Sequence, residues 1–323
     1  LIVFLYTISD FGAVQLMRYD TLTRAIFMSQ LANQSVALAL SLILLLLAGV
    51  IVISERLFSR VTFKMDESLI GEPLEYSLGK WKKPAFFFSV CISVFSIGAP
   101  MLAIGDWASD GIFRSTVGGR PLTIDREQVW ESTWNTFSIS VLAGIAAVLA
   151  VLPIAYMVVR YKSRIGTFSH AVVIATFALP GLLVALSMRF WTLRTDWAYD
   201  LFNNTKALLI FSYVVRFGSL AMGIVLVAVA AVPQRLRDAG RTLGAQKTSR
   251  FMRIDLPLMA PGMGAAAGLV ILSTMKELPI TLLISPLGFS TLATRIFSSF
   301  EDAFVTEAGI MALVLVIISF LLT

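Results

Sequence analysis

Residues 233–257 read PQRLRDAGRTLGAQKTSRFMRIDLP and form a basic loop between two long apolar runs. Residues 234–242 are expected to form one short helix, and a second short helix is expected to run to Asp255. Gly244 lies between the two, where the chain must turn and a side chain would clash. Leu256-Pro257 then predicts the start of a further helix, because proline is tolerated in a first turn.

The composition indicates a membrane protein. Of the 323 residues 57% are hydrophobic and 14% are charged, and the mean hydropathy is +0.83. Soluble proteins average about half apolar and a quarter charged. We therefore expect an all-α fold, a polytopic transmembrane helical bundle surrounded by membrane lipid. The net charge of +6 suggests no nucleic-acid partner, because the basic residues lie in short loops where they orient helices in a bilayer.

Several apolar runs approach the roughly 20 residues that a helix needs to cross the hydrocarbon core. An additional run, 1–17, is interpreted as the remainder of a shortened span, since the chain opens on Leu1 and is apolar from the start. The final run stops at Thr323, and both ends suggest a fragment of a longer protein. The predicted spans are 35–54, 84–105, 134–159, 168–188, 207–232, 258–284 and 305–323.

The distribution of basic residues predicts the orientation. One set of loops carries 15 Lys and Arg residues and the other set carries 9. Loops richer in Lys and Arg face the cytoplasm. The basic set, predicted to be cytoplasmic, comprises 55–83, 160–167 and 233–257, and the opposite set comprises 18–34, 106–133, 189–206 and 285–304.

An internal repeat accounts for the odd number of spans. Asp10-Phe11-Gly12 followed by Thr21-Leu22 resembles Glu277-Leu278-Pro279 followed by Thr291-Leu292, and an apolar run follows each copy. We therefore divide the chain into two repeated halves. Residues 1–54 are the C-terminal end of the first half and contain two spans. Residues 84–323 are the second half, with six spans, and contain the loop 233–257. The join, 55–83, carries mixed charges and is predicted to be a solvated cytoplasmic linker.

The spacing D-A-G-x3-G-x9-I-x-L-P within 233–257 resembles the cytoplasmic "EAA" loop by which membrane subunits of ATP-binding-cassette (ABC) importers dock onto their ATPase. An ordinary basic loop would explain its six Lys and Arg residues, but not its glycine and Leu-Pro at those offsets. Two positions depart from the pattern: Asp238 replaces the usual Glu and Gly240 the usual second Ala. The extra glycine lowers helix propensity by about 1 kcal/mol.

Other segments resemble the fused two-half permeases of ferric iron ABC importers. With them the resemblance covers nearly the whole chain. The Lys276-Glu277-Leu278-Pro279 segment indicates the iron branch. The segments are Ser9–Val14, Arg18–Thr21, Met275–Pro279, Thr281–Leu283 and Thr291–Thr294.

The resemblance implies a binding-protein-dependent transport fold of the MetI-like kind, in a multi-pass protein of the bacterial inner (plasma) membrane. It implies an ATPase dimer as partner at the cytoplasmic loop and a periplasmic or extracellular substrate-binding protein on the other side. The coupling-loop residues that it implies are Asp238, Ala239, Gly240, Gly244, Ile254, Leu256 and Pro257. Thiamine, a polyamine or sulfate stay open as alternative substrates, and an ion-coupled secondary transporter as a different class.

The chain lacks the residues of an ATPase and of a metal centre. The nearest candidate for a phosphate loop, Gly79-Lys80, has Leu74 in place of the first glycine and Trp81 in place of the hydroxyl residue. We expect no catalytic residues and no bound cofactor, with ATP used by a separate subunit. No run of His, Tyr or carboxylates suits Fe³⁺, which prefers oxygen ligands, so no metal ligands are assigned.

Charged residues within apolar runs are candidates for function, because each costs about 2.5–3.5 kcal/mol at a helix centre. Arg216 and Glu277 either pair structurally or lie near the lipid headgroups, or they line a translocation path. Pro180-Gly181 predicts a kink or break in its span. The charges are Asp10, Arg216, Lys276, Glu277 and Glu307, of which the first four are assigned to the path.

Overall fold

The computed structural model describes residues 7, 10–59, 78–113, 116–117, 120–121 and 125–322. This part is almost entirely helical, with one antiparallel pair of two-residue strands, β1 (Thr116–Val117) and β2 (Arg120–Pro121). Residues 60–77 of the predicted linker lie outside the described residues. The helices are α2 (Gly12–Leu16), α3 (Leu22–Ala32), α4 (Gln34–Ser59), α5 (Lys82–Phe113), α6 (Arg126–Val159), α7 (Arg164–Thr176), α8 (Gly181–Arg194), α9 (Asp196–Phe202), α10 (Lys206–Ala231), α11 (Gln234–Thr242), α12 (Lys247–Arg250), α13 (Leu256–Met275), α14 (Pro279–Ile284), α15 (Leu292–Glu301) and α16 (Val305–Leu321), with a 3-10 turn η1 (Gly79–Trp81) and a π-helical turn η2 (Phe251–Asp255).

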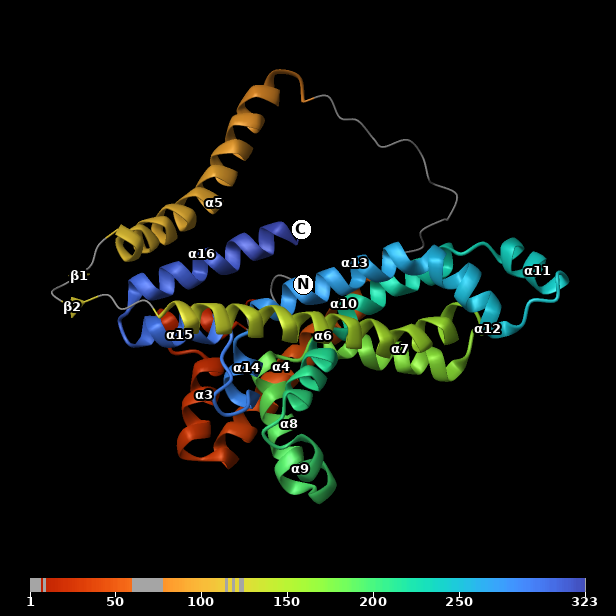
Figure 1. The fold of residues 1–323 in the computed structure, drawn as a ribbon, viewed down its shortest axis with the longest axis horizontal. Helices are drawn as coiled ribbons and strands as arrows, with labels where there is room; N and C mark the ends of the chain where they lie inside the picture. The colour runs from red at the N-terminus through yellow and green to blue at the C-terminus, as the bar shows by residue number, and fades with distance from the viewer. Residues whose placement is uncertain are drawn as a thin grey trace.

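Three long helices, α6, α10 and α13, form the central bundle, and each packs against the other two (Figure 1). Small residues allow this close approach. A Cβ added to Gly144 of α6 would lie 2.9 Å from the carbonyl oxygen of Ala267 in α13, and one added to Gly262 would lie 2.6 Å from the Cβ of Ala228 in α10. Close backbone contact is how helices associate in a bilayer, where apolar burial between them supplies little driving force.

The spanning helices match most of the predicted runs. Within the described residues five helices are long and apolar enough to cross a membrane, and six if α7 and α8 count as one span. These confirm helices at 35–54, 84–105, 134–159 and 207–232. The helix at 305–323, α16, is apolar but has 17 residues. The all-α membrane bundle predicted from the composition is therefore confirmed.

Two predicted spans are interrupted. The run 168–188 is broken into α7 and α8, and the chain bends by 112° between these two helices. The break is at Pro180-Gly181, as the sequence predicted. The run 258–284 was expected to be one continuous span, and that prediction is wrong. Helix α13 ends at Met275 and α14 begins at Pro279, because proline starts a helix readily but disrupts one that is already running.

Residues 1–6 and 8–9 of the predicted span remainder at 1–17 lie outside the described residues, so this stays a prediction. Helix α2 has five residues and is followed by a turn in which Arg18 has φ 53°. The left-handed conformation at Arg18 separates this short helix from α3.

The internal repeat is visible as two similar successions, α2, α3, α4 and α14, α15, α16. Thr21 and Thr291 occupy equivalent places and cap the following helix in the same way. Each side-chain oxygen accepts the backbone N–H three residues on, at 3.4 Å in both copies. The copies meet through Phe11, whose ring centroid lies 4.7 Å from that of Phe27 and 6.1 Å from that of Phe297.

The predicted membrane orientation can be tested with two cysteines, introduced one at a time into a Cys91→Ser background. Thr248 in α12 is exposed. A cysteine in its place should be labelled by an impermeant maleimide only from the cytoplasmic side, because position 248 belongs to the more basic set of loops. Leu287 is 92% exposed, and Leu287→Cys should be labelled only from outside. Labelling of Thr248→Cys from outside intact cells would reverse the topology.

Candidate coupling loop and translocation cavity

The segment 233–257 folds largely as its sequence predicts. Helix α11 covers 234–242, Gly244 has φ +79°, and α13 starts at Leu256. The second short helix differs in detail: α12 has four residues and continues into the π-helical turn η2. Figure 1 shows α11 and α12 at one end of the α6, α10 and α13 bundle, far from α15 at the other end.

Gly240 has a packing role that accounts for its departure from the usual alanine. It is buried, and a Cβ added there would lie 2.9 Å from the Cδ1 atom of Ile254. This glycine therefore lets α11 lie directly on η2. Two of the predicted coupling residues thus contact each other and form the base of the loop.

The other coupling residues face outward or begin α13. Asp238 and Ala239 are exposed on α11, and the Asp238 carboxylate accepts a hydrogen bond from Gln234 at 3.2 Å. Leu256 is half-buried and Pro257 is exposed in the first turn of α13. Leu243, beside the turn, is 87% exposed. The loop thus presents small, acidic and apolar groups to its surroundings, together with exposed Arg and Lys side chains.

A polar cluster at the root of the loop was not found from the sequence. Asp255, at the end of η2, is only 2% exposed. It accepts a hydrogen bond from the Tyr156 hydroxyl at 2.8 Å, and its other oxygen lies 3.3 Å from Nε of Arg237. The aspartate at a loop boundary is the only signal in the sequence. Its partners come from α6 and α11 and cannot be chosen from spacing.

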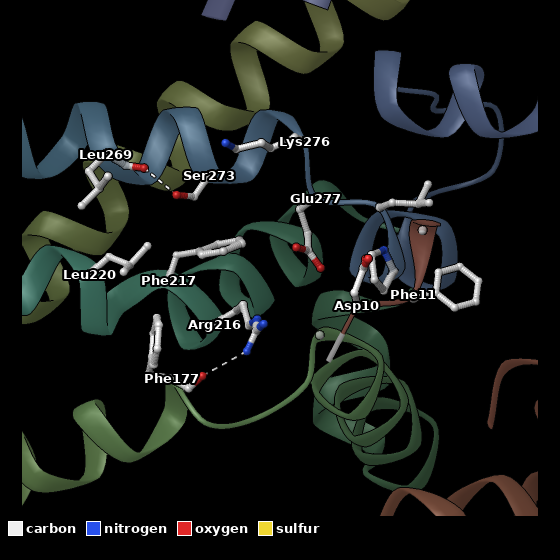
Figure 2. Close-up of a pocket in the computed structure, with 14 residues that line it drawn as sticks. Asp10, Phe11, Phe177, Arg216, Phe217, Leu220, Leu269, Ser273, Lys276 and Glu277 are labelled. Carbon is white, nitrogen blue, oxygen red and sulfur yellow. Dashed lines mark hydrogen bonds between the residues drawn. The ribbon is translucent and has the colours of Figure 1, made fainter. Parts of the chain in front are cut away.

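A cavity of about 460 Å³ contains all four predicted path residues (Figure 2). Arg216 comes from α10, Lys276 and Glu277 from the link between α13 and α14, and Asp10 from just before α2. The structure therefore brings together charges that the sequence places far apart. The remaining lining residues are Phe11, Gly12, Phe177, Gly181, Phe217, Leu220, Leu269, Ser273, Leu278 and Pro279.

Glu277 is half-buried in this cavity. Its carboxylate accepts a hydrogen bond from the backbone N–H of Ile280 and interacts electrostatically with Arg216 and Asp10. Figure 2 shows the carboxylate between those two side chains. Its Oε1 atom is shielded from solvent and has no hydrogen-bond partner among the described residues. A Cβ added to Gly181 would lie 2.5 Å from that oxygen.

Arg216 holds the break between α7 and α8. Its guanidinium donates hydrogen bonds to the carbonyl of Phe177 at 3.3 Å and to that of Leu179. Both carbonyls lie where the helix is interrupted, and such groups require a partner inside a membrane. Gly181, the first residue of α8, contacts Glu277, so the break lies between the two charged side chains.

The remaining intramembrane charge, Glu307, lies outside the cavity lining. It is in the first turn of α16 and accepts a hydrogen bond from Ser299 at 3.4 Å. Within the described residues no group of three or more His, Cys, Asp or Glu residues is placed to hold a metal ion. The two carboxylates of the cavity are therefore not part of a larger ligand cluster in that part of the chain.

Residues 143–323 match the family described as "Binding-protein-dependent transport system inner membrane component". The chain is 30% identical, over 326 aligned residues, to the "Fe(3+)-transport system permease protein FbpB 2" of Haemophilus influenzae, covering 99% of this chain and 62% of that protein. It is 26% identical over 183 residues to the "Putative 2-aminoethylphosphonate transport system permease protein PhnV" of Salmonella typhimurium, covering 57% of this chain and 65% of that protein.

The chain thus spans less than two thirds of the length of either relative. Among solved structures, a chain of the MetNI methionine ABC transporter in an inward-facing conformation is 17% identical, with a TM-score of 0.49. The match covers 61% of this chain and 94% of that one.

Proposed function

Because this chain belongs to the family of binding-protein-dependent transport system inner membrane components, we propose that it is the membrane-spanning permease subunit of an ABC importer for ferric iron. As a member of that family it is a multi-pass transport protein of the inner membrane, not itself an enzyme. A separate ATPase dimer would hydrolyse ATP, and a periplasmic binding protein would deliver the ion.

The observation that carries the proposal is the geometry of the loop 233–257. Its outer surface offers exposed Asp238, Ala239 and Leu243 to a partner. Its base is packed through Gly240 and Ile254. A rigid base allows movement of a docked ATPase to be passed to α13, since a packed contact shifts as a unit.

The cavity would be part of the translocation path. Asp10 and Glu277 supply carboxylate oxygens, which suit a hard cation, and Arg216 and Lys276 balance their charge. A transported ion must bind strongly enough to enter and weakly enough to leave. Two carboxylates beside two basic side chains provide such a weak site. The name of the FbpB 2 relative supports Fe³⁺ as the ion.

A second candidate substrate is a small zwitterion. The PhnV relative is named for 2-aminoethylphosphonate, and a cavity with both acidic and basic side chains offers partners to both of its charges. Thiamine, a polyamine and sulfate remain further alternatives. An ion-coupled secondary transporter is disfavoured by the family match.

The test is uptake into vesicles that contain the protein as the cell makes it, with its ATPase and binding protein. We expect uptake of radiolabelled ferric iron that requires ATP and is unaffected when ionophores collapse the ion gradients. Uptake of labelled 2-aminoethylphosphonate, thiamine, a polyamine or sulfate, with no uptake of iron, would change the substrate assignment. Uptake that does not require ATP, and that stops when ionophores collapse the ion gradients, would overturn the ABC assignment.

A further inference from the structure

We propose that Tyr156, Asp255 and Arg237 form the linkage that couples movement of α11 to the transmembrane helix α6 as well as to α13. The inference rests on the proposed function, because it concerns how an ATPase at the loop would drive the bundle. It makes these three side chains positioning residues for coupling, distinct from the residues that face the ATPase.

Each member of the cluster comes from a different element. Arg237 lies on α11, Asp255 ends η2 immediately before α13, and Tyr156 lies in the last turn of α6. The Arg237 and Asp255 side chains are 14% and 3% exposed. The Arg237 guanidinium also lies 5.9 Å from the centroid of the Tyr156 ring. The three side chains therefore contact one another in a largely buried corner.

The same corner also holds α10. Arg160, one turn after Tyr156 on α6, donates hydrogen bonds to the carbonyls of Val229 and Val232 at 2.5 and 2.7 Å. These carbonyls lie at the C-terminal end of α10, where helix carbonyls lack intrahelical partners. The end of α6 is thereby joined to α10 through Arg160 and to the coupling loop through Tyr156.

Directional bonds explain why a polar cluster occurs here. Helix α11 packs mainly against α12 and η2, so its route to the bundle is narrow. The packed contact of Gly240 with Ile254 passes movement of α11 to η2 and α13 but does not reach α6. The Tyr156 hydrogen bond fixes the distance and direction between α6 and the Asp255 carboxylate, and the ion pair keeps that carboxylate close to Arg237 of α11. A shift of α11 would move the carboxylate, and the carboxylate would move the Tyr156 hydroxyl. Apolar side chains in this corner would need less desolvation but would not give that constraint.

The test compares uptake per ATP hydrolysed in Tyr156→Phe, Asp255→Asn and Arg237→Gln. All are assayed in the complete complex with ATPase and binding protein. Tyr156→Phe removes only one hydroxyl and keeps the ring packed against Phe251, 5.8 Å away between centroids. Tyr161→Phe, at a 72% exposed position just after α6, is the matched control.

We expect ATPase copurification and ATP hydrolysis to stay normal in Tyr156→Phe, while uptake per ATP falls about tenfold. Combining it with Asp255→Asn should cause little further loss, because the two changes remove one linkage. Tyr161→Phe should behave like the wild type.

An unchanged ratio of uptake to hydrolysis in Tyr156→Phe would overturn the inference. Loss of uptake in proportion to loss of copurified ATPase would also overturn it, because the cluster would then serve docking. A wild-type complex that neither retains an ATPase nor takes up substrate would refute the proposed function, and the inference with it.

Discussion

Replacing Gly181 with alanine is expected to lower uptake about tenfold or more while the protein is made and inserted normally. The added Cβ would lie 2.5 Å from Oε1 of Glu277, closer than any real contact, so the flexible carboxylate must move away. Interactions with a charged group contribute about 1.5–3 kcal/mol, which corresponds to a loss of about tenfold or more. Uptake should therefore fall by at least about that factor, with ATP hydrolysis by the partner retained.

The control for this change is Gly268→Ala in α13, since no described atom outside its chain neighbours and its own helix backbone lies within 4 Å of a Cβ added there. Glu277→Gln should reproduce the uptake defect of Gly181→Ala, and the double variant should be no worse than either single one.

A purely structural role for Glu277 gives a different pattern. Glu277→Gln would then lower the amount of protein in the membrane, because a buried charged neighbour would lose its counter-charge. Normal uptake at a normal protein level in both Gly181→Ala and Glu277→Gln would exclude the path and the structural role together.

Gly244→Val is expected to weaken ATPase docking without affecting insertion. Gly244 has φ +79°, and a side chain in this left-handed region costs about 1–2 kcal/mol, with β-branched residues the least tolerated. Apart from Gly244 and its two chain neighbours, no described atom lies within 4 Å of an added Cβ, so the penalty comes from the backbone conformation. Docking should weaken about tenfold, as measured by copurification of the ATPase.

Gly244→Asn is the matched control, because asparagine adopts positive φ more readily than other non-glycine residues. We expect it to retain the ATPase while Gly244→Val does not. Recovery of the ATPase with Gly244→Val at wild-type yield would contradict a role for this turn in docking.

The fold of the loop 233–257 could be predicted from the sequence because its structure depends on local interactions. A glycine at positive φ, a proline in a first turn and hydrogen bonds within a few residues determine α11, the turn at Gly244 and the start of α13. The same holds for the repeat, where Thr21 and Thr291 cap helices that begin at the next residue. The break at Pro180-Gly181 was likewise predicted from the missing backbone donor.

The average hydropathy of a long apolar run gave a wrong prediction where a few residues within the run interrupt the helix. The run 258–284 is apolar enough to read as one helix, but Lys276, Glu277 and Pro279 interrupt it locally. The contact of Gly240 with Ile254 was also missed, and it gives this loop a packed base in place of a second alanine.

Local sequence therefore determined which segments are helices, where the loop turns and which charges lie within apolar runs. Only the tertiary structure decided which of those charges meet. Asp10, Arg216 and Glu277 come from three separate parts of the chain and line one cavity, and Tyr156 reaches Asp255 across 99 positions. Such contacts depend on how helices pack against one another, and the packing is set by the shapes of many side chains at once, which no spacing in the sequence specifies.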